Sequence, residues 1–246
     1  MDFGNFCHPD MPGFGGMQPF RKVGFKPSVD NLADYMASFI KLHYGTQKKF
    51  VVVGYSFGFL VMTRMLQKYP DIRKQCIDVI GLAGLLHKDD VKFTKTRRNF
   101  YILASYIVGS RIGSWVTREI FLRKWFLSNF YTKTHNAKEK FEGLTDEILR
   151  QNVNFEINLW RINDIPTWTF TSREMLRADL VSESEQMQLP VISITVDADK
   201  YFDSRVVEQH MHIVYKDVKV FMADADKLVE AFWLLPWMHN RTFLNR

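Results

Sequence analysis

Cysteine is scarce in this chain, which has only Cys7 and Cys76 among its 246 residues. The two lie far apart and match no spacing of a metal site. A chain of this length buries enough surface to fold without disulfides or metals. We therefore expect both cysteines to be reduced, buried small hydrophobic residues, as in a cytoplasmic protein, and we expect neither a metal nor a cofactor.

Long hydrophobic runs are also missing. The most apolar stretch, residues 100–109, is about ten residues long and too short to cross a bilayer. The N-terminus has neither the basic region nor the apolar region of a signal peptide. Both absences favour a cytoplasmic location.

Basic residues form no long cluster, although 33 Lys and Arg against 27 Asp and Glu give a net charge of +6. Groups such as Arg97-Arg98 and Arg123-Lys124 are only two residues long. Neither has the repeated basic and aromatic pattern of a nucleic-acid-binding surface. We expect a solvated basic surface and no nucleic-acid partner.

Aromatic residues, in contrast, are abundant at 15% of the chain. Aromatic rings fill cores, and they also line apolar pockets and lids. The hydrophobic fraction of 46% and the charged fraction of 24% are ordinary for a globular protein. This composition excludes disordered and fibrous proteins.

Apolar runs alternate with helical spacing along much of the chain. Residues 50–54 form a continuous β-branched run without polar alternation, which is typical of a strand buried on both faces of a parallel sheet. Further apolar runs that predict strands occupy residues 77–82, 190–196 and 218–222. Helices are predicted at residues 29–44, with Ser28 as N-cap and Gly45 as stop, and at 57–69, 204–212 and 228–244. A further short strand is expected at residues 5–8. The order predicts an α/β fold in which the four longer strands are adjacent and central.

The middle of the chain breaks this alternation. Residues 88–188 contain no strong strand pattern and are basic, aromatic and helical in spacing, with one helix expected at 146–158. We interpret them as a helical cap inserted into an α/β core of residues 1–87 and 189–246.

One motif carries chemistry. Residues 54–58 read G-Y-S-F-G and lie between a predicted strand and a predicted helix. A serine on such a tight turn presents its hydroxyl clear of the sheet, and the helix N-terminus beneath it favours a developing negative charge. The alternative is an ordinary strand–turn–helix in which Ser56 only caps the helix.

The motif and its surroundings resemble the α/β-hydrolase superfamily. Residues 10–15, D-M-P-G-F-G, are similar to the turn after the family's fourth strand, and residues 54–58 to its nucleophile elbow. The resemblance implies a serine hydrolase with a mostly parallel sheet and a helical cap. It also implies Ser56 as nucleophile, the Phe57 N–H as an oxyanion donor, and Asp199 as the triad acid, with Asp197 as second choice.

This sequence departs from the family's pattern at the position of the catalytic base. Lys227 stands where the family has histidine, and a lysine with an ordinary pKa near 10.4 is charged and a poor base. His239, on the terminal helix with Pro236 as a potential kink, is a weak alternative base. The other histidines, His8, His210 and His212, are expected to be bystanders, with the last two on the outer part of their helix.

A second departure lies at the start. The family's first three strands and first helix have no counterpart, so the sequence is N-terminally truncated relative to the family and lacks its second oxyanion segment. Either residues 5–8 pair directly with residues 50–54, or the chain is a fragment.

Three functions follow as expectations. The first is a serine hydrolase, esterase- or lipase-like, acting on a small apolar ester or similar acyl substrate, with weak activity because of Lys227. The alternative is a catalytically inactive relative that binds a small apolar ligand or a protein partner. Membrane contact through the basic, aromatic cap is a third and less favoured reading.

Overall fold

A computed structural model describes residues 7–45, 47–123, 125–126, 146–182, 185–196, 199 and 201–223. The chain divides into two units, the first made of Met1–Leu32 and Thr96–Glu174 and the second of Ala33–Lys95 and Met175–Arg246. The helix expected at 228–244 lies outside the described residues. The division into a core and a cap at residues 88 and 188 stays a prediction.

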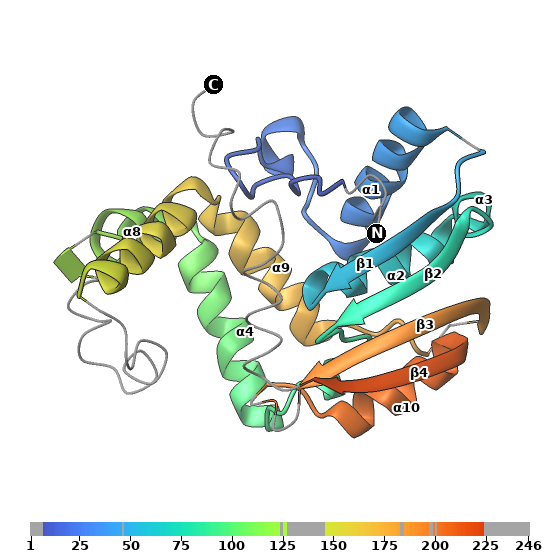
Figure 1. The fold of residues 1–246 in the computed structure, drawn as a ribbon. Helices are drawn as coiled ribbons and strands as arrows, with labels where there is room; N and C mark the ends of the chain where they lie inside the picture. The colour runs from blue at the N-terminus through green and yellow to red at the C-terminus, as the bar shows by residue number, and fades with distance from the viewer. Residues whose placement is uncertain are drawn as a thin grey trace. The chain divides into compact units, whose positions relative to one another are not determined.

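The second unit contains a parallel sheet of four strands in the order β1-β2-β3-β4 (Figure 1). The strands are β1 Phe50–Tyr55, β2 Cys76–Leu82, β3 Met187–Val196 and β4 Tyr215–Ala223. The expected adjacency of the four runs is confirmed. Their central position is not, because β1 and β4 form the edges of the described sheet. Of the strand expected at residues 5–8, Cys7 and His8 are described and belong to no strand.

The helices described in the second unit are α2 Phe57–Lys68, α3 Pro70–Arg73, η2 Lys88–Asp90 and α10 Ser204–Val214. Helix α1 Val29–Tyr44 begins in the first unit and continues into the second. Helix α1 has the predicted bounds and the predicted ends. The Ser28 hydroxyl accepts a hydrogen bond from the Asn31 N–H at 3.3 Å, and Gly45 follows the last residue with φ +65°.

Helices α2 and α10 of the second unit cover one face of the sheet (Figure 1). Figure 1 shows α2 and α10 on the same side, as expected when right-handed crossovers join strands that follow one another in sequence order. On β1 the covered face holds the buried Val52 and Gly54, whereas Val51, Val53 and Tyr55 on the other face are 46%, 47% and 52% exposed. The expectation that β1 is buried on both faces is therefore wrong. A continuous apolar run does not reveal which of its faces a helix covers.

The described residues of the first unit between 96 and 174 are mostly helical, as the sequence predicts. Its elements are η1 Phe20–Val23, α4 Lys95–Gly109, α5 Arg111–Val116, the π-helical η3 Thr117–Phe121, α8 Asp146–Ile162 and α9 Ile165–Arg177. Leu122, Ile157 and Ile165 form a buried cluster in this unit, with Val108 and Trp160 packed against it. No helix within the described residues is long and apolar enough to cross a membrane.

The two cysteines differ in their surroundings. Both are free thiols, as expected, but Cys7 is exposed while Cys76 is buried at the start of β2. Burial raises the pKa of the Cys76 thiol to about 12. The expectation of a buried thiol holds for Cys76 and is wrong for Cys7.

Candidate active site

Ser56 lies in the tight turn between β1 and α2 and has an unusual backbone conformation, with φ +47° and ψ −117°. Such a conformation in a residue other than glycine costs on the order of 1–3 kcal/mol and persists only where neighbouring contacts impose it. Two contacts do so here: the Ser56 N–H donates to the Leu82 carbonyl at 2.9 Å, and the Phe59 N–H donates to the Ser56 carbonyl at 3.0 Å. The Ser56 side chain makes no capping hydrogen bond to α2, which disfavours the interpretation as an ordinary N-cap.

Close packing of α2 on the sheet requires a glycine just before the turn. A Cβ on Gly54 would lie 2.5 Å from the Cα and 2.8 Å from the backbone nitrogen of Phe59. A Cβ on Gly81, in the neighbouring strand β2, would lie 2.9 Å from the Phe59 ring. The start of α2 is thus pressed against β1 and β2, and this fixes the position of Ser56.

The Phe57 N–H lies where the sequence places an oxyanion donor. Phe57 is the first residue of α2, and the N–H groups of a helix's first turn have no acceptor within the helix. The positive end of the helix dipole adds to the attraction for an anion at this point.

Asp199 follows β3 at the same edge of the sheet, because the carboxyl ends of parallel strands meet there. Strand β2 separates β1 from β3, so these two strands are about two strand spacings apart, roughly 10 Å. The Asp199 Oδ1 accepts hydrogen bonds from the N–H groups of Tyr201 at 2.7 Å and Phe202 at 3.0 Å. Lys92 Nζ donates to the Asp199 carbonyl at 2.7 Å.

Partial burial and the negative charge of Asp199 raise the pKa of the hydroxyl of Tyr55, the residue before Ser56. In the expected triad, a proton-accepting side chain would lie between Ser56 and Asp199. The two candidates for that role, Lys227 and His239, lie outside the described residues, as does Asp197.

His210 is not the outward-facing bystander that its helical position suggested. Its Nδ1 lies 2.5 Å from Oδ1 of Asp90, a carboxylate with no exposure. The Asp90 Oδ2 accepts the N–H groups of Leu86 at 2.6 Å and His87 at 2.9 Å. The network ties the loop after β2 to α10. Because 120 residues separate its partners, no local pattern in the sequence could reveal it.

Two further histidines complete this picture. The His87 ring meets the His210 ring edge to face at 4.8 Å, and burial lowers the pKa of His87. His212 is exposed, with Nε2 4.0 Å from a Glu208 carboxylate oxygen, as a bystander should be. Within the described residues no group of three His, Cys, Asp or Glu side chains is arranged to hold a metal ion.

Comparison with known proteins rests on structure alone, since no family model and no curated protein matches the sequence. An epoxide hydrolase from Bacillus megaterium superposes with a TM-score of 0.60 at 14% identity, covering 96% of this chain and 82% of that one. MenH from S. aureus gives 0.57 at 14%, covering 91% and 81%. An esterase from Thermogutta terrifontis gives 0.55 at 15%, covering 94% and 78%. The chain therefore has the fold of the α/β-hydrolase superfamily, as its motifs predict.

Proposed function

We propose that this chain is a serine hydrolase of ester-type, small apolar substrates, with Ser56 as its nucleophile. The backbone conformation of Ser56 carries the proposal. Ser56 is held at φ +47° between a strand and a helix and its side chain makes no capping hydrogen bond, and strained residues of this kind cluster at active sites. The esterase and epoxide hydrolase among its structural neighbours support a hydrolase.

In this proposal each residue has one role. The Ser56 hydroxyl attacks the carbonyl carbon of the ester, and the Phe57 N–H stabilises the negative charge that develops on the carbonyl oxygen. Asp199 orients the group that takes the serine proton. If Lys227 occupies that position, its charge at neutral pH makes it a poor proton acceptor, and turnover is slow.

Labelling with a fluorophosphonate probe tests the nucleophile. An activated serine reacts covalently, so we expect peptide mapping to find the probe on Ser56 and Ser56→Ala to abolish labelling. Ser204→Ala, at the start of α10, is the matched control and should label like the unmodified chain. Labelling that persists in Ser56→Ala would remove Ser56 from the mechanism.

The identity of the base is tested by Lys227→His. A new imidazole beside Asp199 should raise the hydrolysis of short p-nitrophenyl esters above the weak activity expected of the unmodified chain. One outcome would assign the role of base to a residue other than the one at position 227. If the unmodified chain works at an ordinary enzymatic rate and Ser56→Ala abolishes that rate, His239 becomes the first candidate.

The alternative function is binding without turnover. It is favoured by the lysine at position 227, where the resemblance places the catalytic base. A chain that neither labels at Ser56 nor gains activity from Lys227→His, but still binds apolar esters, would support this alternative.

A further inference from the structure

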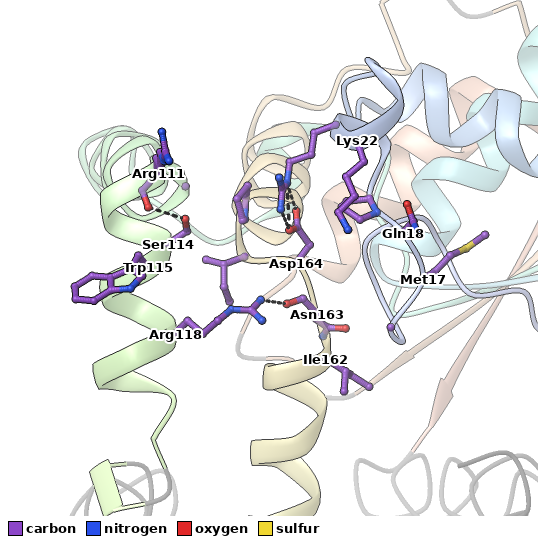
Figure 2. A pocket seen from close by; sticks show the side chains of 16 residues that line it. Met17, Gln18, Lys22, Arg111, Ser114, Trp115, Arg118, Ile162, Asn163 and Asp164 are labelled. Atoms are coloured by element: carbon purple, nitrogen blue, oxygen red, sulfur yellow. Dashed lines mark hydrogen bonds and ion pairs between the residues drawn. The ribbon is translucent and has the colours of Figure 1, made fainter. Parts of the chain in front are cut away.

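The first unit contains a cleft of about 730 Å³, a size typical of small-molecule sites. Its walls come from the loop and η1 near residue 18, from the α4–α5 junction with η3, and from the turn between α8 and α9 (Figure 2). All of these segments belong to the first unit, whereas Ser56 and Asp199 belong to the second.

Basic side chains dominate the lining. Arg21, Lys22, Arg111 and Arg118 face a single acidic residue, Asp164. That acid is already neutralised, because Arg21 contacts it through two nitrogens, with Nη2 at 2.6 Å from Oδ1 and Nε at 3.1 Å from Oδ2. Burial favours the neutral acid, but hydrogen bonds from Arg21 and Thr167 lower the pKa of Asp164, so the pair remains ionised. Three positive charges remain.

The side of the cleft formed by α5 and η3 combines positive charge with an aromatic ring. Arg111, Ser114, Trp115 and Arg118 have the spacing that places side chains on one face of a helix. Trp115 is 63% exposed, which is unusual for so large an apolar side chain. Its ring offers a flat surface beside the charges.

Arg118 is fixed in place rather than extended into solvent. Its Nη2 donates to the Asn163 carbonyl at 3.0 Å and its Nη1 to the Arg161 carbonyl at 3.4 Å. Figure 2 shows it reaching across from its helix to Asn163. Asn163 is held in turn, because its Oδ1 accepts the Gly15 N–H at 3.1 Å. The floor of the cleft is thus organised before any ligand arrives.

We propose that this cleft binds an organic phosphate monoester, with the phosphate among Lys22, Arg111 and Arg118 and the apolar part against Trp115. A phosphate monoester carries about −1.5 to −2 charge near pH 7. It therefore balances the charge of three cations better than a ligand with a single carboxylate does. Arginine is suited to this task because its planar group of donors fits phosphate oxygens. The proposal is independent of the hydrolase activity assigned to Ser56.

Calorimetric titration of the full chain with phenyl phosphate tests the proposal. We expect saturable binding that Lys22→Gln and Arg111→Gln each weaken about tenfold, the usual effect of losing one charged hydrogen bond. Lys26→Gln is the matched control, since Lys26 is an exposed residue of the same loop that does not line the cleft. Trp115→Ala should weaken binding of phenyl phosphate but not of inorganic phosphate.

Two further measurements separate the sources of such a ligand. Flotation with phosphatidylcholine vesicles containing phosphatidic acid, a phosphate monoester, or phosphatidylserine, a diester, shows whether the monoester sits on a lipid headgroup. Preference for phosphatidic acid identifies a lipid, and binding of soluble phenyl phosphate alone identifies a free metabolite. The proposal fails if neither binds, if Lys26→Gln acts like Lys22→Gln, or if Ser56→Ala abolishes binding, since the phosphate would then occupy the serine site.

Discussion

Two glycines flank Ser56 in the G-Y-S-F-G motif, and their surroundings differ. A Cβ on Gly54 would collide with the backbone of Phe59, whereas a Cβ on Gly58 would meet nothing within 4 Å among the described residues. The G-x-S-x-G pattern places a small residue on each side of the serine. The structure supplies a packing reason for the first glycine only.

Alanine substitution at the two glycines should therefore have opposite effects. Gly54→Ala forces α2 away from the sheet and should lower the free energy of unfolding by about 1–3 kcal/mol. Gly58→Ala, in the first turn of α2, should raise it by about 0.5–1 kcal/mol, because alanine loses less backbone entropy in a helix. Chemical denaturation of the two variants measures both. Equal destabilisation by the two would contradict the packing described for Gly58.

At the scale of a helix, Asp164 combines two roles at the start of α9. Its Oδ2 accepts hydrogen bonds from the Thr167 N–H at 3.1 Å and the Thr167 hydroxyl at 2.8 Å, which makes it the N-cap. The same carboxylate pairs with Arg21, 143 residues away in the sequence. Asparagine at this position would keep the cap and lose the charge.

This separation of roles predicts a pH-dependent difference. At pH 7, Asp164→Asn should lower the free energy of unfolding by about 1 kcal/mol and Asp164→Ala by about 2 kcal/mol. The pKa of Asp164 is lower in the folded protein than its unfolded value of about 3.9. The stability from its ionised form is thus complete above about pH 4 and is lost as the pH falls through the folded pKa. Denaturation curves between pH 7 and pH 2 should show the gap between the unmodified chain and the Asp164→Asn variant closing; a constant gap would exclude the ion pair as its cause.

Asp90 holds together two elements that the sequence keeps far apart. Asp90→Ala would leave the N–H groups of Leu86 and His87, together with the His210 ring, without their acceptor. We expect a loss of about 3–5 kcal/mol in the free energy of unfolding. Asp89→Ala is the control, because the Asp89 side chain is 54% exposed and its loss should cost about 0.5 kcal/mol or less. Similar costs for the two variants would show that the buried network contributes little.

How far the sequence predicts this structure depends on how local the cause is. The bounds of α1 follow from its own apolar spacing, Ser28 and Gly45, and the turn at Ser56 follows from a five-residue motif. The exposure of Val51 and Val53 depends on what covers β1 rather than on β1 itself. The pairing of Asp90 with His210 arises only when distant segments meet, so no pattern along the chain records it.

For the molecule as a whole, the borders of the two units fall inside helices. The border between Leu32 and Ala33 lies in α1, and that between Glu174 and Met175 lies in α9. Leu32 and Ala33 are both fully buried. The units are therefore not joined at these two points by exposed linkers of the kind that proteases cut.

Limited proteolysis tests this arrangement. Thermolysin cleaves before apolar residues, and Phe25 is 58% exposed outside any helix. We expect mass spectrometry of a brief digest to find cleavage before Phe25 earlier than cleavage before Ala33 or Met175. Early cleavage at either border would mean that α1 or α9 opens there in solution.

The strand order of the sheet also has a consequence for how the protein is made. Because β1 to β4 lie in sequence order, a ribosome delivers each new strand to the same growing edge. β2 can pair with β1 soon after it emerges, but about 100 residues separate Leu82 from Met187, the first residue of the next strand. At roughly 5–20 residues per second, the open edge of β2 waits about 5–20 s for its partner. An apolar strand edge left unpaired for that time can pair with other chains, and the length of the segment between β2 and β3 sets how long the nascent sheet is exposed to this risk.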